Sequence, residues 1–297
     1  MEYHEGVRFR LLIGLGAALV WAQISGEYRL EKIASGYRFT EGPAWSREGY
    51  MVFSDLPAQR IYKWTPGSAP EVLRESPGRG NGNAFDAAGR LYSCEGGARR
   101  VVRIGAHGRV EVLADSFEGK KLNAPNDLVV RRDGQVYFTD PAYGSADDQR
   151  ELDFYGIYRI TSPGKLEAVA RWKTRPNGIA LTPDQKTLYV ANSDERTITA
   201  WDLDRSGAAT RERVVVRGIE GAPDGIKVDT AGNIWVACRH IAVYSPRGVR
   251  LRLIEVGETP ANLAFDPEFA NLYVTARTSV YRIVLLAKGA TTHSPRE

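Results

Sequence analysis

Residues 126–140 read NDLVVRRDGQVYFTD and predict one β-hairpin. A short apolar run ends at the turn residues Asp133 and Gly134, and a second run of β-branched and aromatic residues follows. An Asp-Gly pair between two such runs is typical of a tight hairpin turn. Asn126 stands directly before the first strand, so the segment consists of a polar residue, a strand, a turn and a second strand.

The same hairpin pattern occurs six times along the chain. The copies are WSREGYMVFSD (45–55), FDAAGRLYSCE (85–95), VRRDGQVYFTD (130–140), LTPDQKTLYVAN (181–192), VDTAGNIWVAC (228–238) and FDPEFANLYVTA (265–276). They repeat every 38 to 52 residues, which is room for four short strands and is the size of a propeller blade. Long amphipathic helical patterns are absent. We therefore predict an all-β fold, a six-bladed β-propeller formed as a single domain by residues 23–297; a large sandwich explains the period less well. Residues 281–285, or a strand after Gln23, are expected to complete a blade shared by the two chain ends.

Composition and charge exclude several classes of protein. The chain has 43% hydrophobic and 26% charged residues, which is ordinary for a globular protein and excludes a disordered chain. The net charge is only +4 and the two signs are interspersed, so we expect no nucleic-acid partner. Cys94 and Cys238 lie in distant repeats and are predicted to be free, buried thiols. We expect a monomer or a weak homo-oligomer.

The first 22 residues resemble an export signal. Arg8 and Arg10 precede the apolar run LLIGLGAALVWA (11–22), which is too short to span a bilayer comfortably. Cleavage after Ala22 would leave Gln23 first, so we expect a periplasmic or secreted protein with no stable membrane association after the signal is removed. An uncleaved anchor or a buried strand is the alternative interpretation of the same residues.

A short motif precedes each hairpin, and its first residue forms a column through the repeats. The motifs are EGPAW (41–45), NGNAF (81–85), NDLVV (126–130), NGIAL (177–181), DGIKV (224–228) and ANLAF (261–265). The column therefore consists of Glu41, Asn81, Asn126, Asn177, Asp224 and Ala261. Equivalent positions in propeller blades lie on a ring around the central axis. We expect this ring to line one mouth of the central channel.

The column predicts a metal site. Two carboxylates and several carboxamides that converge in a channel are costly unless a cation pairs with them. Calcium accepts such oxygen ligands in irregular geometry, and no His or Cys joins the column to favour a typical zinc site. We expect one divalent ion, Ca²⁺ first, with Zn²⁺, Mg²⁺ or Mn²⁺ as alternatives. Asn-Gly and Asp-Gly pairs also form good turns. Turn formation alone does not explain why Glu41 precedes Gly-Pro, or why two of the six repeats have an acid at the same column position.

The motifs together resemble the senescence-marker-protein/gluconolactonase/luciferin-regenerating-enzyme family of calcium-dependent six-bladed propellers. The segments that carry the resemblance are EGPAW (41–45), NGNAFDAAGRLYSCEGG (81–97), LNAPNDLVVRRDGQVYFTDPAYG (122–144), RPNGIALTPDQKTLYVAN (175–192), PDGIKVDTAGNIWVA (223–237) and NLAFDPEFANLYVTA (262–276). The resemblance implies a hydrolase of sugar lactones, such as glucono-1,5-lactone, that yields the aldonic acid.

The resemblance also implies roles for column residues. Glu41, Asn177 and Asp224 match metal ligands, and Asp224 matches the acid/base. Asn126 matches a residue beside the metal that contacts substrate and in some relatives also binds the ion. With Asn126, we expect Asn81 and Tyr143 to contact substrate. Tyr143 lies in the polar segment 141–153, which is either a lid over the channel mouth or a solvated loop.

Two positions depart from the family pattern, and they leave other functions open. Animal members carry an arginine where this chain has Ala124, and many bacterial members carry a histidine where it has Gly96. Both departures remove polar groups near the pocket and leave the sugar specificity open, but they do not affect the predicted metal ring. A hydrolase of other esters or lactones, and a non-catalytic calcium-binding propeller, are the alternative functions. For the lactonase, Asp224 is the expected proton acceptor, and Gly225 is expected to leave room for a water beside it.

Overall fold

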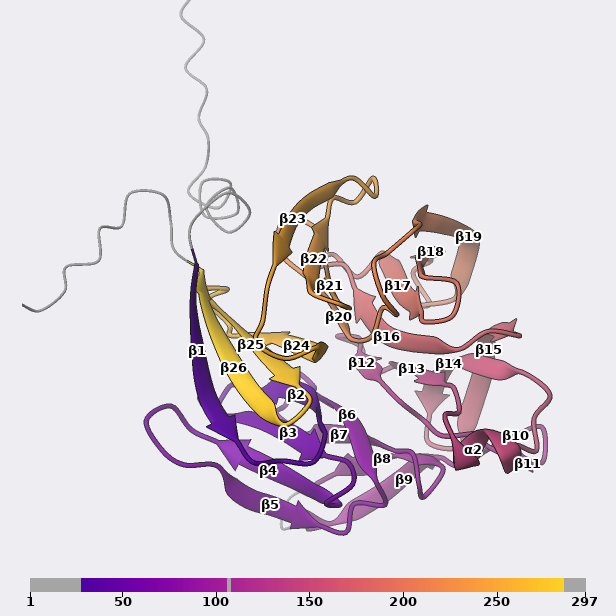
Figure 1. Ribbon diagram of the computed structural model, residues 1–297. Helices are drawn as coiled ribbons and strands as arrows, with labels where there is room; N and C mark the ends of the chain where they lie inside the picture. The colour runs from indigo at the N-terminus through magenta and orange to yellow at the C-terminus, as the bar shows by residue number, and fades with distance from the viewer. Residues whose placement is uncertain (1–27, 106–107, 286–297) are drawn as a thin grey trace, which may run out of the picture.

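The computed structural model describes residues 28–105 and 108–285, which form six four-stranded antiparallel sheets around a central axis (Figure 1). The six sheets follow one another in chain order, as the repeat predicts. The prediction of a six-bladed β-propeller is therefore confirmed. The predicted signal, residues 1–22, lies outside the described residues. Within the described part, no helix is both long and apolar enough to cross a membrane.

Five blades are each built from four consecutive strands, innermost first. Blade 1 contains β2 (Thr40–Trp45), β3 (Met51–Asp55), β4 (Arg60–Trp64) and β5 (Glu71–Glu75). Blade 2 contains β6 (Gly80–Phe85), β7 (Leu91–Glu95), β8 (Arg100–Ile104) and β9 (Val110–Ala114). Blade 3 contains β12 (Leu128–Val130), β13 (Val136–Asp140), β14 (Tyr155–Ser162) and β15 (Lys165–Trp172). Blade 4 contains β16 (Pro176–Leu181), β17 (Thr187–Asn192), β18 (Thr197–Leu203) and β19 (Ala209–Val216). Blade 5 contains β20 (Ile226–Val228), β21 (Ile234–Ala237), β22 (Ile241–Tyr244) and β23 (Arg250–Ile254).

Blade 6 joins the two ends of the described chain. Its strands are β24 (Pro260–Phe265), β25 (Asn271–Ala276) and β26 (Ser279–Leu285), and the outermost strand is β1 (Tyr28–Ser35). β1 pairs antiparallel with β26, from Tyr28 opposite Leu285 to Ser35 opposite Ser279. Both segments expected to close the ring therefore lie in the same blade. The pairing of β1 with β26 therefore closes the ring of six blades.

The outermost strand is the most exposed strand of each blade. All five residues of β3 are buried, whereas four of the five residues of β5 are exposed. Apolar side chains from facing sheets fill the wedges between blades. Between blades 6 and 1, Trp45 stacks on Tyr273 with ring centroids 4.8 Å apart, and Trp64 packs on the same tyrosine. The core is therefore a set of layers between blades, and these layers fix the innermost strands around the channel.

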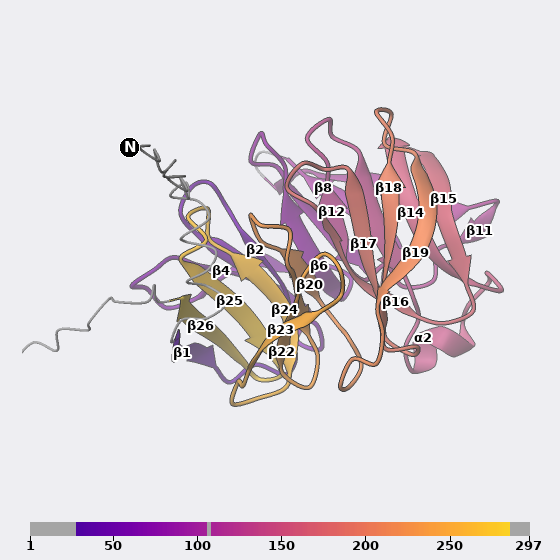
Figure 2. The same cartoon turned by 90° about the horizontal axis from the view of Figure 1, so that it is seen from above.

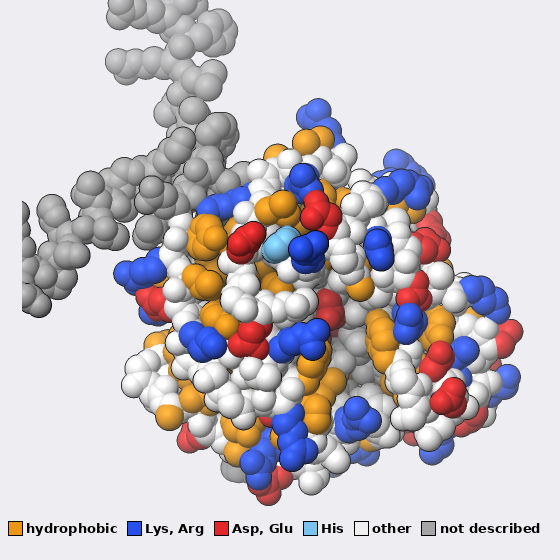
Figure 3. Space-filling view, viewed as in Figure 1, with side chains coloured by type: hydrophobic (Ala, Val, Ile, Leu, Met, Phe, Trp, Pro, Cys, Tyr) orange, Lys and Arg blue, Asp and Glu red, His pale blue; other side chains and the backbone are white. Residues whose placement is uncertain are grey.

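Two short strands and one short helix lie outside the six four-stranded sheets. β10 (Ser116–Phe117) and β11 (Lys120–Lys121) form a small ribbon between blades 2 and 3. The helix α2 (Ser145–Asp148) lies between β13 and β14 and projects from one face of the propeller (Figure 2). Cys94 in β7 and Cys238 after β21 are free and buried, as predicted. Basic and acidic side chains are interspersed on the face seen in Figure 3.

Candidate metal and active site

The six column residues lie where the innermost strands begin. Glu41, Asn81, Asn177 and Ala261 are in the first two positions of their strands, and Asn126 and Asp224 each stand two residues before theirs. Five of the six are buried, and Asp224 keeps partial exposure. The column therefore forms the expected ring at one mouth of the channel. Asp224 is the acid of the ring that solvent reaches most easily.

Hydrogen bonds between neighbouring blades hold the backbone of this ring. The carbonyl oxygens of five column residues each accept a hydrogen bond from the preceding blade. The bonds are Ser54 Oγ to Asn81 (2.7 Å), Gly82 N to Asn126 (2.8 Å), Thr139 Oγ1 to Asn177 (2.7 Å), Gly178 N to Asp224 (3.1 Å) and Gly225 N to Ala261 (2.7 Å). Because these bonds run around the axis, the side chains of the ring are positioned by the whole propeller rather than by flexible loops.

Glycine after the column residue lets the innermost strands approach one another. A Cβ on Gly42 would lie 2.1 Å from the carbonyl oxygen of Asn81, and Gly42 also has a φ of +49°. A Cβ on Gly178 would lie 2.3 Å from the carbonyl oxygen of Asp224. Real Cβ atoms are not found so close to backbone oxygens, so a side chain at either position would push the ring apart.

The charges of the two acids of the ring act on each other. Burial raises the pKa of Glu41. Burial also raises the pKa of Asp224 well above its usual value, and the charge of Glu41 adds to that rise. Asp127 raises the pKa of both groups further. Lys227 and hydrogen bonds from Gly42 and Asn262 lower the pKa of Glu41, and a hydrogen bond from Asn177 lowers that of Asp224. A site that disfavours its own negative charge in this way is suited to a cation.

The side chain of Asn177 is held by two hydroxyl groups. Its amide nitrogen donates to Tyr143 Oη and to Ser193 Oγ, each at 3.1 Å. Ser193 Oγ in turn donates to the carbonyl oxygen of Pro223, immediately before Asp224. The amide nitrogen is thus used by these contacts, and the oxygen is the atom left for a ligand. The structure also brings Tyr143, a predicted substrate contact, beside Asn177.

Behind the ring lies a cluster that the sequence analysis missed, formed by Asp127, Lys227 and Asn262. Asp127 Oδ2 accepts a hydrogen bond from Asn262 Nδ2 at 3.3 Å and lies 4.0 Å from Lys227 Nζ. Lys227 Nζ also donates to Asn262 Oδ1 at 3.4 Å. Asp127 and Asn262 occupy the repeat position that follows the column, where the other four blades have glycine. That exchange of glycine for a polar residue in two blades is the signal that could have revealed the cluster.

The expectation that Gly225 leaves room for a water beside Asp224 is wrong. A Cβ on Gly225 would lie 2.2 Å from Asn262 Oδ1 and Cγ. The Asn262 side chain therefore occupies the space that the glycine leaves. A water that reaches Asp224 has to come from the open mouth instead.

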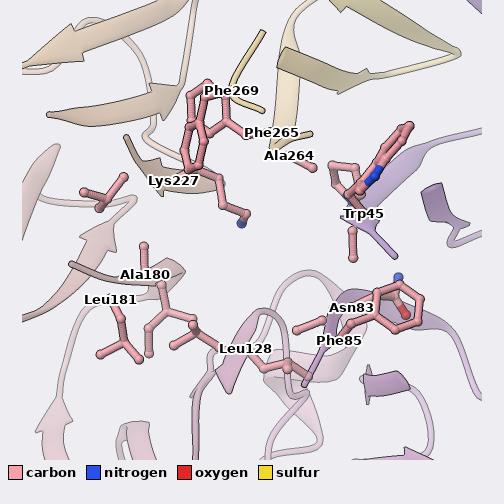
Figure 4. A pocket seen from close by; sticks show the side chains of 16 residues that line it. Trp45, Asn83, Phe85, Leu128, Ala180, Leu181, Lys227, Ala264, Phe265 and Phe269 are labelled. Atoms are coloured by element: carbon pink, nitrogen blue, oxygen red, sulfur yellow. The ribbon is translucent and has the colours of Figure 1, made fainter. Parts of the chain in front are cut away.

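The two ends of the channel differ in chemistry. The end where the innermost strands finish holds a cavity of about 270 Å³ lined by aromatic and aliphatic side chains, with the amino group of Lys227 pointing into it (Figure 4). The end that carries the ring holds a smaller cavity of about 120 Å³. Asn81, Asn126 and Tyr143 line this second cavity, which we call the ring pocket. The three predicted substrate contacts are therefore brought together, beside the predicted metal ligands.

The residues present fit a hard cation. Among residues 28–105 and 108–285, no three His, Cys, Asp or Glu side chains are grouped so that they could hold a metal ion. The donors that the ring offers are two carboxylates with carboxamide oxygens, which are ligands typical of calcium and related ions. The side chain of Asn81 adds a buried Oδ1 that has no hydrogen-bond partner among the described residues.

Fold and site together define a six-bladed β-propeller with a ring of acid and amide side chains at one channel mouth. A sequence model described as the SMP-30/Gluconolactonase/LRE-like region matches residues 39–278. The chain is 32% identical to a gluconolactonase of Zymomonas mobilis, over 86% of this chain and 80% of that protein. The chain belongs to the SMP-30/gluconolactonase/LRE-like family, which confirms the resemblance seen in the sequence.

Solved structures agree with this assignment. A gluconolactonase from Xanthomonas campestris superposes with a TM-score of 0.82 at 32% identity, covering 89% of this chain and 92% of that one. A calcium-binding protein, regucalcin, from Agrobacterium tumefaciens superposes with a TM-score of 0.71 at 20% identity, covering 83% and 90% of the two chains. At that identity the second likeness concerns the fold.

Proposed function

We propose that this protein is a lactonase that depends on a divalent metal ion and hydrolyses sugar lactones, such as glucono-1,5-lactone, to aldonic acids. The observation that carries the proposal is the pair of Glu41 and Asp224 carboxylates in the ring, beside a pocket that is open to solvent. The similarity to gluconolactonases over most of the chain supports a hydrolase of cyclic esters.

Glu41, Asn177 and Asp224 would hold the ion, with Asn126 within the same ring. When bound, such an ion supplies Lewis-acid polarisation of an ester carbonyl. We propose Ca²⁺ as the ion because the donors are oxygen atoms on a carboxylate-and-amide ring.

Asp224 would move the proton. Of the column residues, only Asp224 and Glu41 have carboxylates, and carboxamides cannot act as bases. Glu41 is buried, and its Oε2 accepts a hydrogen bond of 2.8 Å from the backbone of Gly42. Asp224 is the partly exposed acid, and its raised pKa makes it a better proton acceptor than an ordinary carboxylate.

Hydrolysis would take two steps, and one proton would pass through Asp224. A water oxygen attacks the lactone carbonyl carbon while Asp224 accepts a proton from that water. The bond between the carbonyl carbon and the ring oxygen breaks, and the ring oxygen takes up the proton from Asp224. Asn126 and Asn81 would orient the sugar hydroxyls, and Tyr143, held by Asn177, would form the wall of the ring pocket.

Lactone turnover with and without a chelator tests this function. We expect the metal-loaded protein to open glucono-1,5-lactone well above the spontaneous rate, and the chelated protein to lose that activity. Stoichiometric calcium binding without turnover of any lactone would instead identify a non-catalytic calcium-binding propeller. Faster turnover of aryl esters or phosphotriesters than of lactones would favour the other class of hydrolase.

A further inference from the structure

One positive charge in the ring pocket has no partner. Among the residues that the structure describes, Arg79 is the only charged one that lines this cavity, and its side chain is exposed. Among the described residues it has neither a hydrogen-bond nor an ion-pair partner. Arg79 stands two residues before Asn81, so it lies at the rim of the same mouth that carries the ring.

The arginine at the equivalent position of blade 4 is neutralised by a carboxylate. Arg175 stands two residues before Asn177, as Arg79 stands before Asn81. Its guanidinium is paired with Asp194, with Nε 3.0 Å from Oδ1, and lies 4.9 Å from the ring centroid of Tyr143. Arg175 is thus held in place by protein groups, whereas the guanidinium N–H donors of Arg79 are available to a ligand.

The backbone of Arg79 and the small residues around it place its side chain at the pocket. Arg79 has a φ of +55°, which is unusual for a residue with a side chain. Its stem lies against Gly97, where a Cβ would come within 3.0 Å of Arg79 Cγ and Cδ. Gly96 and Ala124 line the pocket beside it with small side chains. The pocket therefore has room next to the Arg79 side chain.

A second polar group without a partner lies next to this cation. Asn81 lines the same pocket, is only 9% exposed, and has a buried Oδ1 with no hydrogen-bond partner among the described residues. Buried polar atoms of this kind are normally satisfied. A ligand with a hydroxyl near Asn81 and a negative group near Arg79 would satisfy both.

The charge balance of the mouth allows a negative ligand once an ion is bound. Glu41 and Asp224 carry a formal charge of −2 when both are ionised, and a divalent ion would bring this to zero. Arg79 is then the excess charge at the mouth. Guanidinium groups bind carboxylates and phosphates in a planar two-point arrangement.

From these observations we infer that the substrates are lactones of sugar acids that carry a second acidic group, a carboxylate or a phosphate, and that Arg79 binds this group. The inference rests on the proposed lactonase function and specifies its substrate class. Hydrolysis itself is unchanged: the acidic group binds Arg79 and takes no part in bond breaking.

Matched substrate pairs test the inference. The phosphate arm compares 6-phosphoglucono-1,5-lactone with glucono-1,5-lactone, and the carboxylate arm compares glucaro-1,4-lactone with glucono-1,4-lactone. Each pair differs chiefly in the acidic group. We expect the wild type to have a lower KM for the acidic member of at least one pair, and the arm that shows it identifies the group.

Two variants and one control separate recognition from folding. Arg79→Gln should raise KM for the acidic lactone about tenfold and leave kcat and the KM for the neutral lactone within about twofold. Gly97→Ala keeps the charge but displaces the Arg79 stem, so it should produce the same selective rise. Arg247→Gln removes an exposed charge from the turn between β22 and β23, on the opposite face, and should change neither KM.

Binding without turnover keeps this test separate from that of the proposed function. Calorimetric titration with 6-phosphogluconate and glucarate, against gluconate as the neutral-tail control, measures the role of Arg79 even if no lactone is hydrolysed. We expect tighter binding of an acidic compound by the wild type than by Arg79→Gln. Equal effects of Arg79→Gln on acidic and neutral ligands, or no preference in the wild type, would overturn the inference. Absence of turnover with Arg79-dependent binding intact would overturn only the lactonase.

Discussion

The backbone N–H of Gly178 donates a hydrogen bond of 3.1 Å to the carbonyl oxygen of Asp224 and so joins the innermost strands of blades 4 and 5. The bond sets the spacing between Asn177, which precedes Gly178, and Asp224, two of the proposed metal ligands. Similar bonds connect the other blades around the channel. The geometry of the site is therefore a property of the closed ring.

Substitution of Gly178 by alanine should disturb this spacing. The new Cβ would lie 2.3 Å from the carbonyl oxygen of Asp224, so Gly178→Ala should lower the free energy of unfolding by about 1–3 kcal/mol and weaken calcium binding. Gly105→Ala is the control, because among residues 28–105 and 108–285 its Cβ would meet only Arg109 O, at 3.7 Å. Urea unfolding and calcium titration of both variants measure the effect. Equal behaviour of the two would show that the ring tolerates a wider spacing.

Glu258 should stabilise the closing blade in a way that depends on pH. Burial raises the pKa of Glu258, but hydrogen bonds from Ser279, Thr278 and Tyr281 outweigh it and bring the pKa down to about 2. A lowered pKa in the folded state gives stability that is complete above about pH 4.5 and is lost as the pH falls toward 2. Glu258→Gln should therefore cost about 2 kcal/mol at pH 7 and clearly less at pH 3.

The exposed Glu255, three residues earlier, provides the control for this prediction. It has no hydrogen-bond or ion-pair partner among the described residues. Urea unfolding of the wild type, Glu258→Gln and Glu255→Gln at both pH values measures the difference. A loss for Glu258→Gln that stays constant between pH 7 and pH 3 would mean that its hydrogen bonds, rather than its charge, provide the stability.

Much of this architecture follows from the sequence because the repeat is local. Each hairpin has its own turn and its own pair of apolar strands, so six copies specify six sheets, and equivalent positions fall on one ring. The prediction could place Glu41, Asn177 and Asp224 on that ring without knowing any contact between blades.

The remaining features depend on contacts between residues far apart in the chain. Asp127 and Asn262 meet across the channel although 135 positions separate them. Whether Gly225 leaves open space depends on Asn262 of the next blade, and the partner of Arg175 distinguishes it from Arg79. The pattern within one repeat contains none of this information.

Asp224→Asn should separate metal binding from proton transfer. The amide keeps an oxygen ligand but cannot accept the proton of the attacking water. We expect kcat for a sugar lactone to fall by roughly 10²–10⁴-fold, with a smaller loss of metal affinity. Calcium content must be measured on the same samples, since a carboxylate also contributes charge to the site. Wild-type turnover by the fully loaded variant would make Asp224 a ligand only.

Export is a proposal that rests on residues 1–22 alone. The basic start and the apolar run 11–22 are typical of a cleaved signal. N-terminal sequencing of protein from the periplasm or the medium should begin near Gln23. Full-length protein that begins at Met1 and stays in the cytoplasm would contradict the proposal.

The most direct test of the central claim is the metal content of the protein measured together with its lactone turnover. Elemental analysis of dialysed wild type should find one divalent ion per chain, and Glu41→Gln should retain markedly less. Turnover of glucono-1,5-lactone should disappear when the ion is removed with a chelator and return when calcium is added back. Full turnover by protein that elemental analysis shows to be free of metal would contradict the account, as would stoichiometric metal retained unchanged in Glu41→Gln.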